Sequence, residues 1–336
     1  MRIVLILITI FMLNCSSPKS ESAAPAGEPL TVEKADPGLD AIVPANATFE
    51  KLAGGFDFTE GPVWINDGGY LLFSDIPRNT IYKWTPGATE AVEFRKPSGY
   101  DGTDAPAGAF IGSNGLTLDK EGRLIICQHG NGKVARLEKD GSLTVLADKY
   151  EGKRLNSPND AVYHSSGVLY FTDPPYGFPL QDKDPKKELA FNGIYRLANG
   201  TLTLLHKDLT RPNGLGFSPD EKYLYVANSD PQRKIWMKFE VDAQGLLQNG
   251  IVFHDATSAT ADGLPDGLKP DKQGNIYATG PGGVWIFSPD AKLLGKLIFP
   301  EIPANLHWGD ADGKTLYVTA RKGLYRTKLN LEGIRP

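Results

Sequence analysis

Six short motifs recur along the chain, and each opens with a side chain that can supply an oxygen ligand. The six opening residues are Glu60, Asn114, Asn159, Asn213, Asp266 and Asn305. Carboxylates and amides without Cys or clustered His suit a hard divalent cation, and Ca²⁺ fits best because it accepts mixed carboxylate, amide and water ligands. Glu60 and Asp266 would balance the charge of such an ion. If the opening residues converge in space, they can form one cation site.

These dipeptides also have a simpler interpretation as tight turns. Asn-Gly and Asp-Gly are common turn sequences because both residues tolerate positive φ. A single Asn-Gly is therefore more readily explained as a turn than as a ligand. Glu60 is a poor turn residue, and Asp266 follows Pro265. These two positions are the least explained by turn chemistry.

A repeated structural element must place the six motifs relative to one another. Each opening residue leads through a turn into an aliphatic-aromatic run, and successive opening residues are separated by 54, 45, 54, 53 and 39 residues. This spacing is typical of one four-stranded blade per repeat. The chain is therefore predicted to be all-β, with a six-bladed β-propeller over residues 47–332. Residues 48–58 are expected to add a strand to the last blade and close the ring, since an open stack of sheets would expose long apolar edges.

The N-terminal region is predicted to be a targeting segment and a linker. Met1-Arg2, an apolar stretch over residues 3–13 and Cys15 predict a lipoprotein-type signal peptide over residues 1–15, with an ordinary secretory signal as the alternative. Residues 16–46 are rich in Ser, Ala, Pro, Glu and Gly and are predicted to be a flexible tether without a core. The chain is thus expected to be an exported bacterial protein, periplasmic or in the cell envelope, that contacts a membrane only through a lipid on Cys15. Cys127 is predicted to be a buried, inert thiol.

Charge and composition restrict the partners. The formal net charge is -4, which offers no basic surface to neutralise phosphates. Nucleic-acid binding is therefore not expected, and the predicted partner is a small-molecule substrate.

The ordered motifs FTEGPVW, SNGLTLD, NSPNDAVY, YFTDPPYG, RPNGLGFSPD and LPDGLKPD resemble those of the gluconolactonase, senescence-marker-protein and luciferin-regenerating-enzyme-like family of six-bladed propellers. The resemblance covers about residues 48–330. It implies that one divalent cation on the axis is held by Glu60, Asn213 and Asp266, and that Asn159 is a further ligand or a substrate contact. Zn²⁺, Mn²⁺ and Mg²⁺ are alternatives to Ca²⁺.

The chain departs from the family pattern at one substrate-binding position. Family members that act on aldonolactones carry an Arg where this chain has Ser157, and Arg154 is nearby but out of register. The substrate is for this reason expected to differ from a simple aldonolactone. The candidate substrate-binding residues are Asn114, Asn159, His129, Asp173 and Tyr176. For His129, a hydrogen-bonded loop histidine is the alternative.

The resemblance implies a divalent-metal-dependent hydrolase of a small cyclic ester, with a gluconolactonase-like sugar lactonase as the favoured activity. Asp266 is the candidate general base, and a hydroxide on the cation is the competing nucleophile. Two other functions remain open at this point: a phosphotriesterase that uses the same metal site, and a non-catalytic ligand-binding propeller. The chain has no G-x-S-x-G motif and no zinc-type spacing of its five His residues, which argues against serine-hydrolase and zinc-site chemistry.

Overall fold

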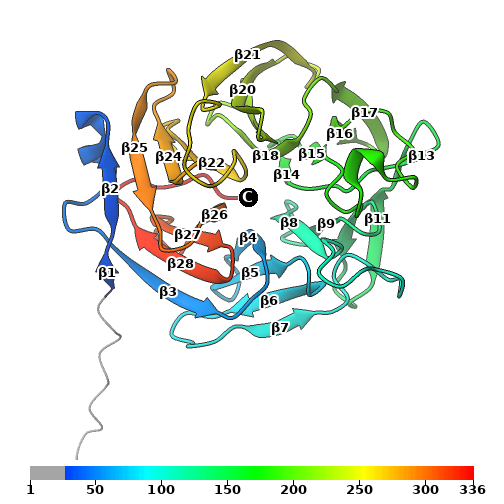
Figure 1. Cartoon of the computed structure of the whole chain (residues 1–336), viewed down its shortest axis with the longest axis horizontal. Helices are drawn as coiled ribbons and strands as arrows, with labels where there is room; N and C mark the ends of the chain where they lie inside the picture. The colour runs from blue at the N-terminus through cyan, green and yellow to red at the C-terminus, as the bar shows by residue number, and fades with distance from the viewer. Residues whose placement is uncertain (1–26) are drawn as a thin grey trace, which may run out of the picture.

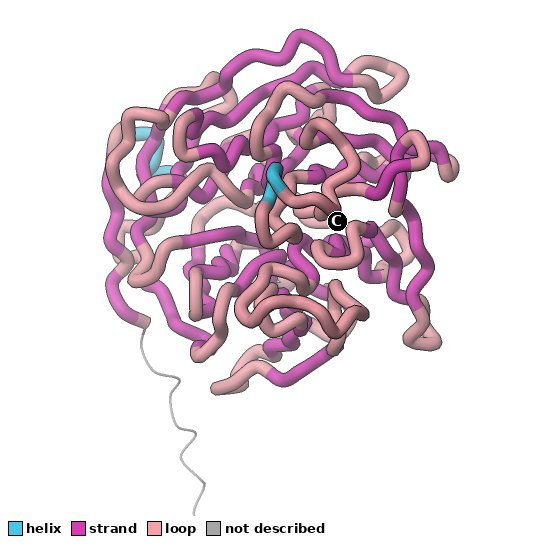
Figure 2. Tube along the Cα trace, turned by 45° about the vertical axis from the view of Figure 1, so that its right-hand side comes forward, coloured by secondary structure: helices cyan, strands magenta, loops and turns pink. Residues whose placement is uncertain are grey.

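The computed structural model describes residues 27–336, so the predicted signal segment, Cys15 and residues 16–26 of the predicted tether lie outside the described residues. Six antiparallel sheets surround a central axis (Figure 1). The trace is mostly strand and loop, with two short 3₁₀ helices, η1 (Pro37–Ala41) and η2 (Gln181–Lys183) (Figure 2). The predicted six-bladed β-propeller is confirmed. Within residues 27–336, no helix is long and apolar enough to span a membrane.

The blades follow the chain in order, and each begins at its innermost strand. Blades 1 and 2 contain β4 (Thr59–Ile65), β5 (Tyr70–Asp75), β6 (Thr80–Trp84) and β7 (Val92–Arg95), then β8 (Ser113–Leu118), β9 (Leu124–Gln128), β10 (Lys133–Leu137) and β11 (Leu143–Ala147). A separate hairpin follows, formed by β12 (Lys149–Tyr150) and β13 (Lys153–Arg154). Blades 3 and 4 contain β14 (Ala161–Tyr163), β15 (Leu169–Asp173), β16 (Gly193–Ala198) and β17 (Thr201–His206), then β18 (Pro212–Phe217), β19 (Tyr223–Asp230), β20 (Arg233–Val241) and β21 (Leu247–Asp255).

The last two blades each carry an extra strand from the N-terminal region. Blade 5 contains β22 (Leu268–Pro270), β23 (Ile276–Gly280), β24 (Gly283–Phe287), β25 (Leu293–Ile298) and β2 (Thr31–Lys34). Blade 6 contains β26 (Pro303–Gly309), β27 (Thr315–Ala320), β28 (Gly323–Lys328), β3 (Thr48–Gly54) and β1 (Glu28–Pro29). Because β3 pairs with β28, the predicted closing strand is confirmed.

The prediction of a flexible tether is wrong from residue 28 onward. β1 pairs with β3, and β2 pairs with β25, so one short segment extends the outer edges of two neighbouring blades. The helix η1 follows, and Leu39 and Ile42 are buried in the core cluster shared by these blades. The average composition of residues 16–46 concealed this role, because the few large apolar residues lie where they can cover two sheet edges.

Aromatic side chains join neighbouring blades. Trp64 of blade 1 stacks on Tyr317 of blade 6 with ring centroids 5.2 Å apart, and Tyr277 of blade 5 meets Trp308 of blade 6 at 4.8 Å. Such contacts bury large apolar areas between the sheets. Cys127 lies in a similar cluster between blades 2 and 3, and burial raises the pKa of its thiol, which agrees with the predicted inert cysteine.

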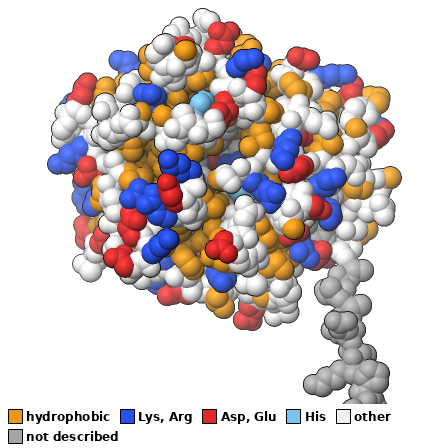
Figure 3. Space-filling model, turned by 180° about the vertical axis from the view of Figure 1, so that it is seen from behind, with side chains coloured by type: hydrophobic (Ala, Val, Ile, Leu, Met, Phe, Trp, Pro, Cys, Tyr) orange, Lys and Arg blue, Asp and Glu red, His pale blue; other side chains and the backbone are white. Residues whose placement is uncertain are grey.

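The C-terminal segment lies at the centre of the ring (Figure 1). The backbone N–H of Ile334 donates to the carbonyl of Pro270 at 3.1 Å, and Gly333 forms a bridge with Asp271. Packing therefore continues beyond the predicted boundary at residue 332. On the face drawn in Figure 3, basic and acidic side chains of the described residues are interspersed, so this face has no continuous basic patch.

Candidate active site

Five of the six opening residues line one pocket of about 350 Å³ at the axis, namely Glu60, Asn114, Asn159, Asn213 and Asp266. They come from the innermost strands or from the residues just before them. In β4, β8 and β18 the pairing register shifts at or beside the opening residue. A bulge of this kind redirects a side chain out of the regular ladder. The predicted convergence of the opening residues is confirmed for these five.

The glycines that follow the opening residues act as contact points between blades rather than as turns. A Cβ atom on Gly61 would lie 1.9 Å from the carbonyl oxygen of Asn114, and one on Gly214 would lie 2.2 Å from that of Asp266. Of the glycines at positions 61, 115, 214 and 267, only Gly61 has a positive φ. The tight-turn interpretation is therefore wrong for the other three. Glycine is required there because the backbone of the next blade approaches closely.

The sixth opening residue, Asn305, supports the site from behind. Its Nδ2 donates to Oε2 of Glu60 at 2.9 Å, and the backbone N–H of Gly61 donates to the same oxygen at 2.6 Å. Asn305 does not line the pocket. It fixes the orientation of the Glu60 carboxylate.

The two carboxylates of the pocket destabilise each other's charged forms. Burial raises the pKa of Glu60 to about 7, and the charge of Asp160 adds to this shift. Burial and the charge of Glu60 raise the pKa of Asp266 well above its ordinary value. Since desolvation and repulsion penalise two buried carboxylates, a cation between them would stabilise both charged forms.

Three buried oxygen atoms in this pocket have no hydrogen-bond partner. They are Oδ1 of Asn114, Oδ1 of Asn213 and Oδ1 of Asp266. Buried polar atoms are normally paired, so three unpaired acceptors around one pocket are available to a cation or to a hydrogen-bond donor. Among residues 27–336, no group of three or more His, Cys, Asp or Glu side chains is placed to hold a metal. The oxygen donors of the pocket, two carboxylates and several amides, fit a hard cation rather than a soft one.

His129 contacts two of the predicted ligands or substrate contacts. Its Nε2 lies 3.1 Å from Nδ2 of Asn114 and 3.5 Å from Nδ2 of Asn159, while its Nδ1 lies 3.3 Å from the carbonyl oxygen of Phe110. Burial lowers the pKa of His129 to about 4, so the ring is neutral at neutral pH. With the proton on Nδ1 donated to Phe110, Nε2 accepts from the amide of Asn114.

Tyr176 lines the pocket as predicted, whereas Asp173 does not. The hydroxyl of Tyr176 donates to the carbonyl of Ser229 at 3.3 Å, and burial, followed by the charge of Asp266, raises the pKa of Tyr176. Asp173 is fully buried and accepts from the backbone N–H of Asn156 at 2.8 Å. The prediction of Asp173 as a substrate contact is wrong, because this carboxylate does not line the pocket. It accepts a hydrogen bond from the loop that leads to Asn159.

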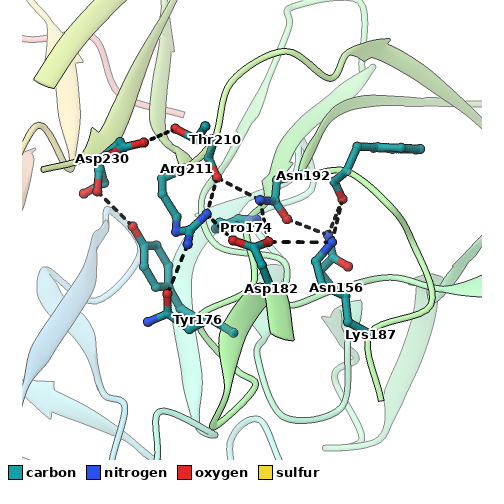
Figure 4. Close-up of polar contacts among 12 residues, drawn as sticks. Asn156, Pro174, Tyr176, Asp182, Lys187, Asn192, Thr210, Arg211 and Asp230 are labelled. Carbon is teal, nitrogen blue, oxygen red and sulfur yellow. Dashed lines mark hydrogen bonds and ion pairs between the residues drawn. The ribbon is translucent and has the colours of Figure 1, made fainter. Parts of the chain in front are cut away.

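The loop that carries Tyr176 is held by a polar network between blades 3 and 4 (Figure 4). Arg211 pairs with Asp182 and donates to the carbonyl of Thr210 at 2.7 Å. The same carbonyl accepts from Nδ2 of Asn192, also at 2.7 Å. These bonds fix one side of the pocket rim.

Ser157, which stands where the family resemblance implies an arginine, does not line the pocket. Its hydroxyl donates to the carbonyl of Pro174 at 2.5 Å and accepts from the N–H of Gly177 at 2.9 Å, so it faces its own loop. Arg154 donates to the carbonyls of Leu155 and Asn156 and does not line the pocket. The pocket is instead lined by Arg321, which follows β27 and which the sequence analysis missed.

Other lining residues that the sequence did not reveal form an apolar wall and part of the rim. They are Phe58, Ile76, Phe110, Gln181, Ser229, Gly263, Leu264, Ile302, Pro303 and Ala304. Phe58 and Phe110 meet edge to face at 5.1 Å, and the guanidinium of Arg321 lies 6.0 Å from the ring of Phe58. Most of these residues lie outside the strands, where no periodic pattern indicates which side chains face inward.

Comparison with known proteins gives consistent matches over most of the chain. Residues 58–322 match the model of the SMP-30/Gluconolactonase/LRE-like region. A gluconolactonase of Zymomonas mobilis is 40% identical over 313 residues, which cover 90% of this chain and 87% of that protein. A pentonolactonase of Haloferax volcanii is 25% identical over 79% of this chain and 81% of its own. The solved structure of a gluconolactonase from Xanthomonas campestris superimposes with a TM-score of 0.77 at 29% identity, covering 91% of this chain and 98% of that one. The chain therefore belongs to the SMP-30/gluconolactonase/LRE-like family.

Proposed function

We propose that this protein is a divalent-metal-dependent lactonase that hydrolyses a small sugar lactone, with Ca²⁺ as the favoured cation. The observation that carries the proposal is the group of unpaired, buried oxygens of Asn114, Asn213 and Asp266 around one pocket that also contains Glu60. The relatives named as a gluconolactonase and a pentonolactonase support the choice of substrate. No observation favours a phosphotriester as the substrate.

Glu60, Asn159, Asn213 and Asp266 would hold the cation, with Asn305 fixing the Glu60 carboxylate. When bound, a divalent cation polarises a carbonyl oxygen and stabilises the negative charge that develops on it. In this proposal the side chain of Asn114 orients the substrate together with the rim residue Tyr176.

Asp266 is the proposed general base. Without a cation, burial and the charge of Glu60 raise the pKa of Asp266 well above that of an exposed aspartate, and a bound cation would offset part of this rise. It would accept a proton from the attacking water as the water oxygen bonds to the lactone carbonyl carbon. The ring C–O bond then breaks, and the proton passes to the departing alkoxide, which gives a hydroxy acid.

A pH-stat assay with glucono-δ-lactone tests the proposal. We expect chelator to abolish hydrolysis, Ca²⁺ to restore it, and Asp266→Asn to remain inactive after Ca²⁺ is added. Asp312→Asn is the matched control, because Asp312 lies on the surface in an ion pair with Lys328. Activity that resists chelator, or full activity of Asp266→Asn, would contradict the proposal. Cleavage of a phosphotriester without cleavage of any lactone would replace the proposed substrate.

We also propose that the chain is exported and anchored through a lipid on Cys15, which rests on the sequence of residues 1–15 alone. Metabolic labelling with palmitate should label the wild-type protein in the membrane fraction, and Cys15→Ser should lose the label. An unlabelled wild-type protein in the soluble periplasmic fraction would favour an ordinary secretory signal.

A further inference from the structure

A buried ion pair lies on the axis next to the candidate site. Nζ of Lys269 is 3.4 Å from Oδ2 of Asp160, and the two side chains are only 14% and 3% exposed. The other carboxylate oxygen of Asp160 accepts from the backbone N–H of Ala161 at 2.9 Å. Lys269 belongs to β22 of blade 5, and Asp160 precedes β14 of blade 3, so the pair reaches past blade 4.

The pair is located between two pockets of the central channel. Asn159 and Asp266 line the candidate site, whereas Ala161 and Lys269 line a second pocket, also of about 350 Å³, which includes Ile334 of the C-terminal segment. The stretches 159–161 and 266–269 therefore each contribute a residue to both pockets. Lys269 can keep its ammonium partly hydrated from the second pocket while it contacts Asp160.

The charges of this pair act on the proposed cation site. Asp160 directly follows Asn159, and Lys269 lies three residues after Asp266; Asn159 and Asp266 both line the candidate site. Glu60 and Asp160 are buried, and Asp266 is half-buried with its Oδ1 atom buried. In their charged forms, three carboxylates and one ammonium leave two net negative charges, which match one divalent cation.

We propose that Lys269 is a positioning residue that holds Asp160 out of the ligand set and offsets its charge, and that the ion pair thereby sets the affinity of the site for a divalent cation. This inference rests on the metal dependence proposed above. Asp160 then acts through the net charge of the channel and not as a ligand.

Three variants separate this role from others. Asp160→Asn leaves the charge of Lys269 unopposed beside the site and should weaken Ca²⁺ binding by about tenfold. The double variant Asp160→Asn/Lys269→Met restores the net charge and should bind Ca²⁺ within about threefold of wild type. Lys269→Met alone removes the positive charge of the ammonium and leaves Asp160 charged. This variant should bind Ca²⁺ at least as tightly as wild type. Asp119→Asn is the matched control, because it breaks another largely buried ion pair, with Arg123, that lines neither pocket, and its affinity should stay within about twofold.

Isothermal titration calorimetry of the chelator-treated full chain with CaCl₂ measures these affinities, and circular dichroism confirms that each variant is folded. Restored affinity in the folded double variant would support the proposal. If the double variant binds as weakly as Asp160→Asn, Asp160 is a ligand or a purely structural residue, and the inference is wrong. Weaker binding by Lys269→Met would also contradict it. Absence of binding by the wild type to Ca²⁺, Mg²⁺, Mn²⁺ or Zn²⁺ would overturn the metal dependence and this inference with it, whereas the other outcomes concern the inference alone.

Discussion

Nε2 of His129 accepts a hydrogen bond from Nδ2 of Asn114 at 3.1 Å, and this contact determines which atom of the amide faces the pocket. With its nitrogen held by the imidazole, Asn114 leaves Oδ1 buried and unpaired. The carbonyl of Phe110 fixes the other ring nitrogen of His129. The histidine therefore orients a polar group of the site, which is a more specific role than the substrate contact predicted from the sequence.

Removal of the His129 acceptor should impair the site without unfolding the protein. We expect His129→Phe to reduce kcat/KM for glucono-δ-lactone by about 10- to 100-fold, since residues that orient ligands have effects of this size. His129→Gln, whose amide oxygen can accept the same bond, should retain more activity. The measurements are initial rates at saturating Ca²⁺ and the Tm of each variant. Equal activity of His129→Phe and wild type would show that the contact has no functional role.

Arg321 should act in substrate binding. Its guanidinium lies near the ring of Phe58 at the pocket, where it can donate to a polar substituent of the substrate. We expect Arg321→Met to raise KM for a sugar lactone by about tenfold, the usual scale for one lost charged hydrogen bond. The Kd for Ca²⁺, measured by calorimetry, should not change. A lower affinity for Ca²⁺ with unchanged KM would contradict this assignment.

The N-terminal segment should contribute to the stability of the propeller. Leu39 is 1% exposed in the cluster between blades 5 and 6, and truncation of such a side chain costs about 2–5 kcal/mol. We expect Leu39→Ala to lower the free energy of unfolding in urea by this amount. Glu33→Ala is the control, since the Glu33 side chain is 62% exposed and should change stability by less than about 0.5 kcal/mol. A loss below about 1 kcal/mol for Leu39→Ala would indicate that the segment is only loosely attached.

Asp173 should make the stability of the protein depend on pH. Burial raises its pKa to about 7 from an ordinary value of 3.8, so the folded protein retains a proton that the unfolded chain has released. The contribution of Asp173 to the free energy of unfolding therefore decreases as pH rises between these two values. Relative to wild type, Asp173→Asn should gain up to about 1.4 kcal/mol for each pH unit across this window. Urea unfolding at several pH values between 4 and 7.5 measures this, and parallel curves for the two proteins would refute it.

The repeats were sufficient to predict the blades, the closing strand and the five opening residues that line the pocket. Periodicity converts position in the sequence into position around an axis, so residues such as Glu60 and Asp266 could be brought together without a structure. The same reasoning could not distinguish a glycine in a turn from a glycine at a close approach. The close approach at Gly214 could be recognised only in the structure, because the carbonyl of Asp266 that excludes a Cβ atom belongs to another blade.

The errors have equally specific causes. Asp173 ends β15, as Asp75 ends β5, and each accepts a backbone N–H from the loop before the inner strand of its own blade. Comparison of these repeat-equivalent residues would have indicated a structural role for both. Lys269 and Arg321 carried no repeated signal, since their importance depends on which charges they approach across the channel or the pocket.

In our proposal, the pocket holds a divalent cation through Glu60, Asn159, Asn213 and Asp266. The most direct test is the shift in Tm of the chelator-treated protein when Ca²⁺ is added, compared between the wild type and Asn213→Ala. A ligand that binds only the folded state at 100 times its Kd stabilises it by about 2.7 kcal/mol, which raises Tm by several degrees. We predict this rise for the wild type and its loss in Asn213→Ala at the same Ca²⁺ concentration. An identical rise in both proteins, or no rise in the wild type, would contradict the proposed site.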